Sequence, residues 1–176
     1  MTALKDIQLR VAGVIEESIV DGPGLRFVLF LQGCHIHCEG CQNPQTWDFE
    51  GGTLVSAAEV LERIKRDPIV HGVTFSGGEP FEQAEALLPL ASALKEQGYH
   101  LMAFTGYTLD YLCQKPECRA FLEKLDLLVD GPYIEAQKSL DLRFRGSRNQ
   151  RIINIPATRE NGWSVVLDEL NEDVER

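Results

Sequence analysis

Apolar residues recur along this chain in short segments whose spacing alternates between the pattern of a buried strand and that of an amphipathic helix. The segment 25–31 is almost continuously apolar and ends at Gln32-Gly33, which is typical of a buried strand in a parallel sheet. Ser56 and Glu59 have the spacing of a capping box, and the apolar residues that follow share one face of a helix. The first third of the chain therefore predicts a strand, a loop and a helix.

The same alternation continues toward the C-terminal end. Further strands are expected at 73–75, 100–105, 127–130 and 151–155. Helices are expected at 81–94, closed by Gly98, within 109–125 with an interruption at Pro116, and from about residue 167. Repeated strand–helix units predict a parallel sheet with right-handed crossovers and functional residues at the C-terminal ends of its strands. A complete eight-unit barrel needs about 250 residues. The 176 residues of this chain therefore predict an α/β fold with an incomplete, TIM-like (β/α) barrel, formed as one domain over residues 1–176.

The loop after the first predicted strand carries the strongest chemical signal. Its sequence over 33–47 is GCHIHCEGCQNPQTW, which supplies three cysteines, Cys34, Cys38 and Cys41. Three thiolates that hold a four-iron, four-sulfur cluster leave one iron without a protein ligand, as a catalytic metal site leaves one position open for substrate. A closed zinc site with His35 or His37 as the fourth ligand is the alternative. The spacing alone leaves both open.

Composition excludes several other classes of protein. The five cysteines are an odd and sparse set, and the start MTALKDIQLR has no apolar signal-peptide segment, so we expect a reducing cytoplasm and no disulfide framework. No apolar run approaches the ~20 residues of a membrane-spanning helix, so we expect no membrane partner. A net charge of −10 argues against nucleic acid as a partner, because that binding depends on clustered Lys and Arg.

A second candidate motif is the segment 76–80, SGGEP, which follows a predicted strand. Paired glycines allow backbone conformations and close ligand approach that a Cβ atom would block. Pro80 suits the first turn of a helix, whose free amides can bind a carboxylate. By itself this segment could equally be a plain strand-to-helix turn with a solvated Glu79.

Taken together, the motifs resemble a known family. The CxxxCxxC spacing of the three cysteines resembles the signature of radical S-adenosylmethionine (SAM) enzymes, and Gly77-Gly78-Glu79 resembles the GGE motif of that family. Further segments look like the activating enzymes of glycyl radical proteins, and most like the ribonucleotide reductase activases: 21–26, 43–44, 46–47, 104–107, 129–132, 145–147 and 149–150. Gly40 replaces the aromatic residue common in radical SAM enzymes, but a glycine is common there in ribonucleotide reductase activases. The resemblance covers nearly the whole chain.

The resemblance implies an oxidoreductase function. The chain would activate an anaerobic ribonucleoside-triphosphate reductase by reductive cleavage of SAM and abstraction of a hydrogen atom from a backbone glycine, which leaves a glycyl radical on that protein partner. The cofactors would be SAM and one [4Fe-4S] cluster held by Cys34, Cys38 and Cys41, while the protein supplies ligation, orientation and exclusion of water. An electron donor such as flavodoxin or ferredoxin would reduce the cluster. The fold implied is the incomplete barrel of a single radical SAM domain.

The same resemblance implies a set of SAM-binding residues. Gly40 and Gln42 would lie beside the adenosine through their backbone. Gly77, Gly78 and Glu79 would hold the methionine end, where Glu79 can accept a charge-assisted hydrogen bond from the amino group. Asp130 would face the SAM pocket from its strand.

Three alternatives remain open at this stage: an activase of another glycyl radical enzyme of the pyruvate formate-lyase type, a radical SAM enzyme acting on a small molecule, and a noncatalytic zinc-binding module. Cys113 and Cys118 are expected to be ordinary thiols, since a second cluster would require more ligands. Trp47 and Trp163 are expected to be core aromatics. The basic residues of 143–151 are expected to contact SAM or the reductase.

Overall fold

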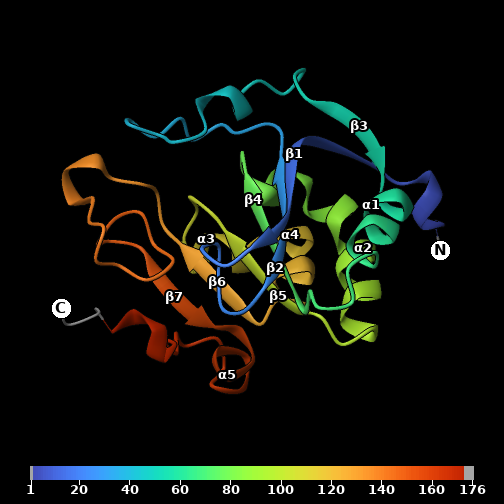
Figure 1. Cartoon of the computed structure of the whole chain (residues 1–176). Coiled ribbons are helices and arrows are strands. Elements are labelled where there is room, and N and C mark those ends of the chain that lie inside the picture. The colour runs from blue at the N-terminus through green and yellow to red at the C-terminus, as the bar shows by residue number, and fades with distance from the viewer. Residues whose placement is uncertain (1, 173–176) are drawn as a thin grey trace.

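A computed structural model describes residues 2–172 and contains one seven-stranded mixed sheet in that range (Figure 1). The strands are β1 (Gln8–Ser18), β2 (Arg26–Leu31), β3 (Thr53–Ser56), β4 (Gly72–Gly77), β5 (His100–Phe104), β6 (Leu127–Asp130) and β7 (Arg151–Asn154). Their order is β3-β1-β2-β4-β5-β6-β7. β2, β4, β5 and β6 are parallel neighbours, whereas β1, β3 and β7 pair antiparallel. Because these four strands are parallel, the loops that follow them all begin at the same edge of the sheet.

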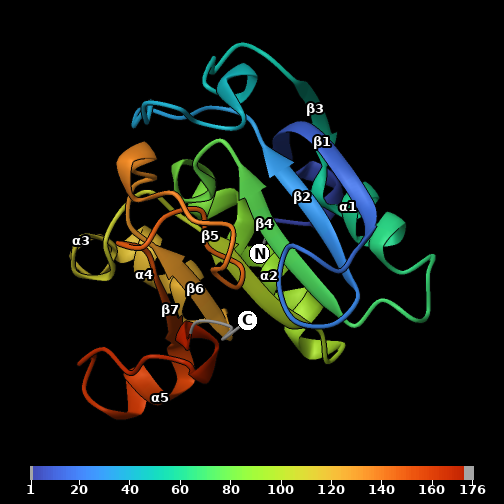
Figure 2. The same ribbon diagram turned by 60° about the vertical axis from the view of Figure 1, so that its left-hand side comes forward.

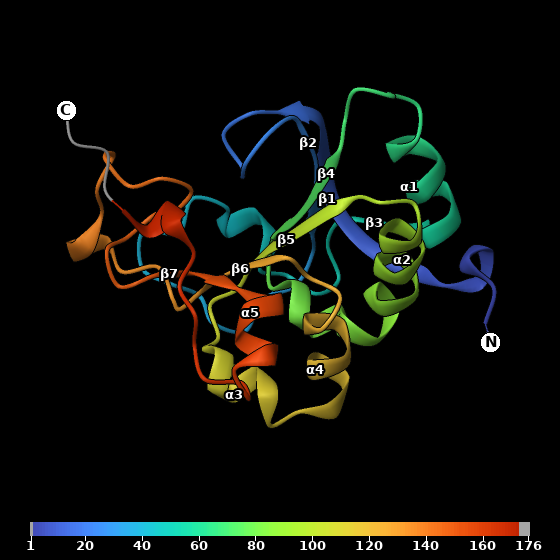
Figure 3. The same ribbon diagram turned by 90° about the horizontal axis from the view of Figure 1, so that it is seen from below.

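Helices cover one face of this sheet (Figure 3). They are α1 (Ala57–Ile64), α2 (Ala84–Glu96), α3 (Leu109–Cys113), α4 (Pro116–Leu122) and α5 (Ile155–Glu160). The main core lies between this layer and the sheet, where Phe27, Leu29 and Leu31 of β2 belong to the same buried cluster as Leu87 and Leu94 of α2. Burial of these apolar side chains is the dominant favourable term in folding. The helical layer therefore fixes the face of each strand that points away from solvent.

Within residues 2–172, the opposite face of the sheet carries no helical layer and is only partly covered. Because side chains alternate across a strand, Phe30 of β2 and Phe104 of β5 point to this face, away from the main core. A small second cluster of Met102, Leu127, Val129 and Ile152 occupies part of it. The rest is open near the C-terminal ends of β2, β4 and β5. The cysteine loop follows β2 at this end of the sheet (Figure 2).

Most of the expected elements are present with nearly the expected bounds. β2, β4, β5 and β6 match the four central strand predictions, and α4 begins at Pro116, where the sequence predicts an interruption. The capping box is confirmed, since the Ser56 hydroxyl accepts from the Glu59 amide at 3.2 Å. Gly98, with φ of +85°, ends α2 as expected. The expected helix 81–94 begins with a 3₁₀ turn, Pro80–Gln83, before α2.

The all-parallel arrangement predicted from the alternation is wrong at both sides of the sheet. β1 and β3 were not predicted, and β7 pairs antiparallel with β6, from Leu127 opposite Asn154 to Asp130 opposite Arg151. A parallel return requires a crossover, usually a helix, and segment 131–150 contains only the 3₁₀ turn Glu135–Gln137. The acidic helix expected from about residue 167 is a 3₁₀ turn, Glu169–Asn171, as far as the described residues extend.

A buried arginine ties the parallel strands together at their N-terminal ends. Arg26 is 1% exposed, and its guanidinium donates to Thr74 Oγ1 at 2.7 Å and to the carbonyl oxygens of Val73 and Pro23 at 2.9 Å. It also donates to the carbonyl oxygen and to Nδ1 of His100, both at 3.1 Å. Burial lowers the pKa of Arg26 to about 10. These contacts join β2, β4 and β5 through one side chain.

The loop 21–24 packs against this arginine. A Cβ atom on Gly22 would lie 2.8 Å from Met102 Sδ and 2.9 Å from Arg26 Cδ, and its φ of +137° also favours glycine. The Asp21 carbonyl accepts from Thr74 Oγ1 at 2.8 Å. This loop leads into β2, the second strand of the chain. No helix among residues 2–172 is both long and apolar enough to cross a membrane.

The Arg26–His100 contact predicts a pH-dependent stability. Nδ1 of His100 must accept from Arg26, so His100 is neutral in the fold, and burial followed by the Arg26 charge lowers its pKa below 6.5. The unfolded chain then binds a proton that the native state excludes, so the free energy of unfolding should fall as the pH drops below about 6.5. Urea titrations at pH 7.5 and 5.5 measure this loss, which should shrink in His100→Asn and persist in the exposed control His71→Asn. An equal pH dependence in all three proteins would contradict the assignment.

Candidate functional site

A cavity of about 590 Å³ opens on the helix-free face, over the C-terminal ends of β2, β4 and β5. Its walls come from segments far apart in the sequence: the β1–β2 hairpin, the cysteine loop, the β4 turn, the loop after β5 and the 131–150 segment. Both views of the ribbon show the cysteine loop and the 131–150 segment on this side of the sheet (Figures 1 and 2). Ligands of α/β proteins bind at this position, outside the carboxyl ends of parallel strands.

All three cysteines of the loop line this cavity, and none of the five cysteines of the chain forms a disulfide. The loop is closed at its base by two backbone hydrogen bonds, from the Gly33 amide to Thr46 O at 2.7 Å and from the Cys34 amide to Trp47 O at 3.1 Å. The side-chain amide of Gln32 also donates to the carbonyl oxygens of Gln45 and Asp48. The end of β2 thus holds the loop in a closed shape that presents its sulfur atoms to the cavity.

Backbone amides of the loop point at two of the sulfur atoms. The Asn43 amide donates to Cys41 Sγ at 3.4 Å. Burial raises the pKa of Cys34, while hydrogen bonds from the Ile36 and His37 amides oppose that rise. Hydrogen bonds to sulfur stabilise thiolate ligands and tune the metal centre that they hold. The loop therefore has the donor set of an anionic iron–sulfur site.

Neither histidine of the loop is placed beside the cysteines as a fourth zinc ligand. Within residues 2–172, no three His, Cys, Asp or Glu side chains converge on a point where one metal ion could bind. Both candidate fourth ligands have other contacts, since His35 Nδ1 lies 3.2 Å from a Glu82 oxygen and the His37 ring stacks on Trp47 with centroids 4.4 Å apart. Three thiols that face one open cavity fit a multi-iron cluster with one iron left for a further ligand.

The double glycine of the β4 turn packs directly on the cysteine loop. The Gly78 amide donates to Leu31 O at 2.7 Å and the Glu79 amide to Gly33 O at 2.8 Å. Gly77 has φ of +96°, and a Cβ atom there would lie 2.6 Å from the backbone of Leu31. A Cβ atom on Gly78 would collide with the Gly33 carbonyl. The two glycines therefore allow the two loops to pack closely against each other, and they also line the cavity.

Glu79 is a buried acid at the centre of this junction. Its side chain is 1% exposed, and Oε1 accepts from Thr105 Oγ1 at 2.9 Å and from the Phe81 amide at 3.1 Å. Oε2 accepts from the Gly106 amide at 2.8 Å. Burial raises the pKa of Glu79 to about 7, and these hydrogen bonds oppose the rise. The solvated-turn interpretation of Glu79 is therefore wrong, because this residue is almost completely buried.

The cavity wall offers both charges to a zwitterionic ligand. A carboxylate has about four lone-pair sites, and the three donors to Glu79 leave one site for a donor in the cavity. Among the described lining residues, Arg145 is the single Lys or Arg side chain, and the carboxylates are those of Asp21 and Glu79. A ligand with an amino and a carboxylate group would find complementary partners here.

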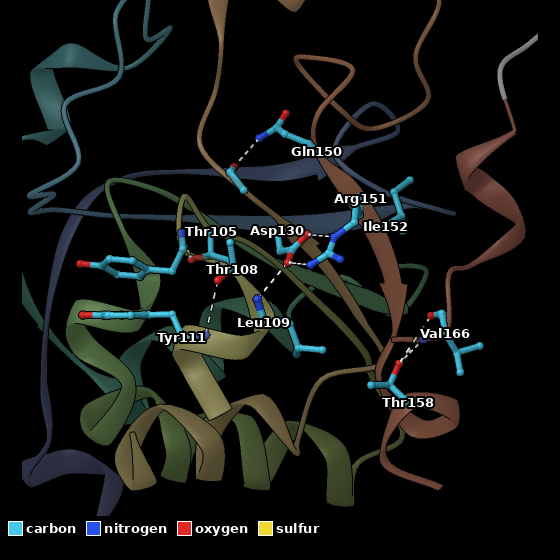
Figure 4. Close-up of polar contacts among 12 residues, drawn as sticks. Thr105, Thr108, Leu109, Tyr111, Asp130, Gln150, Arg151, Ile152, Thr158 and Val166 are labelled. Atoms are coloured by element: carbon cyan, nitrogen blue, oxygen red, sulfur yellow. Dashed lines mark hydrogen bonds and ion pairs between the residues drawn. The ribbon is translucent and has the colours of Figure 1, made fainter. Parts of the chain in front are cut away.

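Two of the predicted SAM-binding residues do not line the cavity. Asp130 is buried and turned toward β7, where Arg151 donates to it through Nε at 2.9 Å and Nη2 at 2.5 Å, and it also caps α3 by accepting from the Leu109 amide (Figure 4). Its neighbour Gly131 reaches the wall instead. Gly40 has φ of +73° and lies against the Glu135 side chain. Gln42, Gly77, Gly78 and Glu79 line the cavity.

The cavity also contains residues that the sequence did not single out for a role here. Thr105 and Gly106 hold Glu79, while Phe30 and Phe104 form its apolar floor. Trp47, expected to be a core aromatic, lines the wall. Cys113 and Cys118 lie elsewhere, in the α3–α4 region, and burial raises the pKa of Cys118 to about 11, which suits an inert thiol.

Comparisons with known proteins give the chain a family. The model of a 4Fe-4S single cluster domain matches residues 20–153. The anaerobic ribonucleoside-triphosphate reductase-activating protein of Haemophilus influenzae is 36% identical over 143 residues, which cover 77% of this chain and 91% of that protein. A pyruvate formate-lyase-activating enzyme of Clostridium pasteurianum is 43% identical over 104 residues, covering 56% of this chain and 44% of that protein. This chain thus matches less than half the length of the second relative.

Among solved structures, the crystal structure of QueE from Escherichia coli aligns with 60% of this chain and 55% of its own, with a TM-score of 0.49 and 22% identity. The matching cluster domain covers most of the chain, and the reductase-activating relative is matched over nearly its whole length. The chain therefore belongs to the radical SAM activases of glycyl radical enzymes, the family to which both activating proteins belong, and its cofactors are a [4Fe-4S] cluster and SAM.

Proposed function

We propose that this protein activates an anaerobic ribonucleoside-triphosphate reductase. Cys34, Cys38 and Cys41 would hold the cluster, and Gln42, Gly77, Gly78 and Glu79 would bind SAM. The observation that carries the proposal is that the cysteine loop and the Gly77–Glu79 turn are hydrogen-bonded to each other at the wall of one cavity. Gly40 and Asp130 would support the site without contacting SAM. Gly40 would shape the cysteine loop against Glu135, and Asp130 would hold Arg151 in place beside the site.

When bound, the cluster and SAM supply a one-electron reductive cleavage that ends with methionine, 5′-deoxyadenosine and a glycine residue that has lost one hydrogen atom. The electron would come from a low-potential donor of the flavodoxin or ferredoxin kind. The protein's residues bind, orient and exclude water: Glu79 would accept from the amino group of SAM and Arg145 would donate to its carboxylate. Phe30 and Phe104 line the floor with apolar surface that limits water near the reacting groups.

We also propose that the sheet is an incomplete barrel of the radical SAM type and that residues 1–176 form a single domain. Four parallel strands, with helices on one face and the cavity on the other, support this interpretation. The cavity face corresponds to a barrel interior that is not closed by further strands.

The protein partner would dock at the mouth of the cavity. Ile19 and Val20, at the tip of the β1–β2 hairpin, are 74% and 73% exposed, and Leu140 of the 131–150 segment is 86% exposed. Val20 and Leu142 also line the cavity, so exposed apolar side chains continue from the surface into the site. Apolar patches of this kind mark interaction sites. We propose that they hold the main-chain segment of the reductase that carries the glycine.

The decisive test combines the anaerobically reconstituted protein with SAM, a reductant and an anaerobic ribonucleoside-triphosphate reductase. A doublet glycyl radical signal in the electron paramagnetic resonance spectrum is expected, with one 5′-deoxyadenosine per radical, and a reductase whose radical-site glycine is alanine should give none. A radical that forms only on a pyruvate formate-lyase would favour the other activase class. Hydrogen transfer to a free small molecule without either protein would overturn the proposal.

In the same assay, the double variant Ile19→Asp with Leu140→Asp, two exposed positions outside the cavity lining, should lower the radical yield roughly tenfold or more at limiting reductase, because charged side chains replace the apolar docking surface. SAM cleavage in the absence of reductase should be unchanged. Ile69→Asp, at an apolar position that is 60% exposed near the opposite end of the strands, is the control. Equal yields from both variants would place the docking surface elsewhere.

Each cluster thiolate should be individually essential. Cys34→Ala, Cys38→Ala and Cys41→Ala should each abolish assembly of the [4Fe-4S] cluster and SAM cleavage, because each thiolate holds a different iron. Cys113→Ala and Cys118→Ala should retain both properties, since these thiols lie in the α3–α4 region. Iron and sulfide analysis after anaerobic reconstitution measures the outcome. Full cluster content in Cys38→Ala would refute the ligand assignment.

Glu79→Gln should leave the cluster intact but weaken SAM binding by about 1.5 to 3 kcal/mol, the range for a hydrogen bond to a charged group. Thr105→Ala, which removes one donor to Glu79 and keeps the carboxylate, should cost less. Isothermal titration of the cluster-loaded proteins with SAM gives both affinities. If Glu79→Gln binds SAM as tightly as the wild type, Glu79 only holds the two loops together.

A further inference from the structure

One edge of the sheet is left open beside the cavity. β1 has β2 on one side and β3 on the other, but β3 pairs only with Gln8–Val11. Among residues 2–172, no strand pairs with that side of β1 beyond Val11. The edge strand at the other end of the sheet differs, since Ile153 of β7 forms a bridge with Leu167. We call the segment 12–17 of β1 the β1 edge, and Figure 2 shows β1 on the outer side of β2.

The β1 edge is accessible to solvent. Ile15 is 42% exposed, and Ala12, Glu16 and Glu17 are exposed as well. A Cβ atom on Gly13 would meet nothing within 4 Å beyond its chain neighbours. Strands in a sheet exchange main-chain hydrogen bonds with a neighbour on each side, so an edge without a neighbour presents N–H and C=O groups to solvent. The β1 edge is therefore a template for one more strand.

The β1 edge also continues into the cavity. Ile15 lines the cavity, as does Val20 at the tip of the β1–β2 hairpin. Gly13 pairs with Phe30 of β2, which lines the cavity too, so Gly13 and Ile15 share the cavity face of β1. A strand added here would lie about 4.8 Å from β1 and would direct every second residue toward this face. Gly13 has no side chain there, which leaves room for the added residues.

The reacting atom of the proposed protein substrate is a main-chain carbon, which favours recognition through the main chain. A glycine has no side chain for a pocket to bind. When an extended segment adds to a sheet edge, main-chain hydrogen bonds provide affinity and alternate side chains provide specificity. Register shifts between Val11 and Gly13 and between Ile15 and Ser18 limit the regular part of this edge to a few residues. The β1 edge therefore suits a short extended segment.

Two glutamates determine which strand can bind to the β1 edge. Glu16 accepts from Arg63 Nε at 2.7 Å, and Glu17 beside it is exposed. Like charges on neighbouring strands are destabilising, so two copies of this chain, each with a net charge of −10, would repel each other at this edge. A segment with Lys or Arg near its glycine would be complementary instead.

We propose that the reductase segment that carries the radical-site glycine binds as an added β-strand along residues 12–17 of β1, with basic side chains near its glycine. The added strand extends the sheet at the open side of the incomplete barrel and holds the glycine beside the cavity. The inference rests on the proposed function, and it gives the mode by which the protein substrate binds.

The test uses synthetic peptides that carry the radical-site glycine of an anaerobic ribonucleoside-triphosphate reductase, each with one N-methyl group at a different position. An N-methyl group removes one main-chain donor, and in an added strand only every second residue donates to its neighbour. Fluorescence anisotropy measures peptide affinity for the cluster-loaded, SAM-bound protein. The affinity should fall roughly tenfold for methyl groups at alternate positions and stay near the unmodified value for those between them. A loss that does not alternate, or no loss at any position, would overturn the inference.

Hydrogen–deuterium exchange with the intact reductase gives a second measurement. Main-chain amides within 12–17 should exchange more slowly in the complex, whereas those of β3 should not change. Glu17→Lys should weaken the complex severalfold, because it repels basic side chains of the added strand. Glu50→Lys, at an exposed glutamate just before β3, is the matched control and should bind as the wild type does.

Unchanged exchange within 12–17, or equal affinities of Glu17→Lys and Glu50→Lys, would overturn the inference. The two proposals fail in different ways. If a glycyl radical still forms on the reductase without these signs of strand addition, the proposed function stands and this binding mode is wrong. If the cluster-loaded wild type forms no radical on the reductase, the proposed function is refuted, and the inference with it.

Discussion

The buried carboxylate of Glu79 is the interaction on which the geometry of the site depends. It accepts from the Phe81 and Gly106 amides and from Thr105, so one side chain ties the turn after β4 to the loop after β5. The glycines before it pack on the end of β2 and on Gly33. Three loops from three parallel strands therefore meet around one charge that has lost most of its water. Desolvation raises the pKa of Glu79 to about 7, and a cationic amino group in the cavity would favour the ionised form again.

Arg26 has the corresponding role at the other end of the same strands. Its guanidinium joins β2, β4 and β5 through carbonyl oxygens, a hydroxyl group and a neutral histidine, without a carboxylate in direct contact among the described residues. A buried cation without a counterion is costly, but five hydrogen bonds with fixed partners specify the register of the strands that carry the site. Within the motif segment 21–26, Gly22 and Arg26 therefore have a structural role, whereas Asp21 lines the cavity.

Residues that a motif brings together in sequence can thus have different roles in the fold. Gly77 and Gly78 were expected to let a ligand approach, and they also let two loops approach each other. Asp130 was expected in the SAM pocket, but its carboxylate is occupied by Arg151 and by the start of α3, while Gly131 reaches the wall (Figure 4). Side chains alternate across a strand. Neighbouring residues can therefore differ in role, as Gly131 in the cavity wall and Asp130 in an ion pair with Arg151 do.

The features that depend on local chemistry can be predicted from the sequence alone. The apolar run before the cysteine loop, the Ser56 cap, the Gly98 helix end and the CxxxCxxC spacing each identify an element or a ligand set from neighbours along the chain. Tertiary packing sets the antiparallel pairing of β1, β3 and β7 and the burial of Glu79, and it leaves the Trp47 indole without a hydrogen-bond partner among the described residues. These depend on contacts such as Glu79 with Gly106 or Arg26 with His100, which join residues distant in sequence. Strand partners and buried hydrogen bonds are set by packing over the whole chain, and no local pattern encodes them.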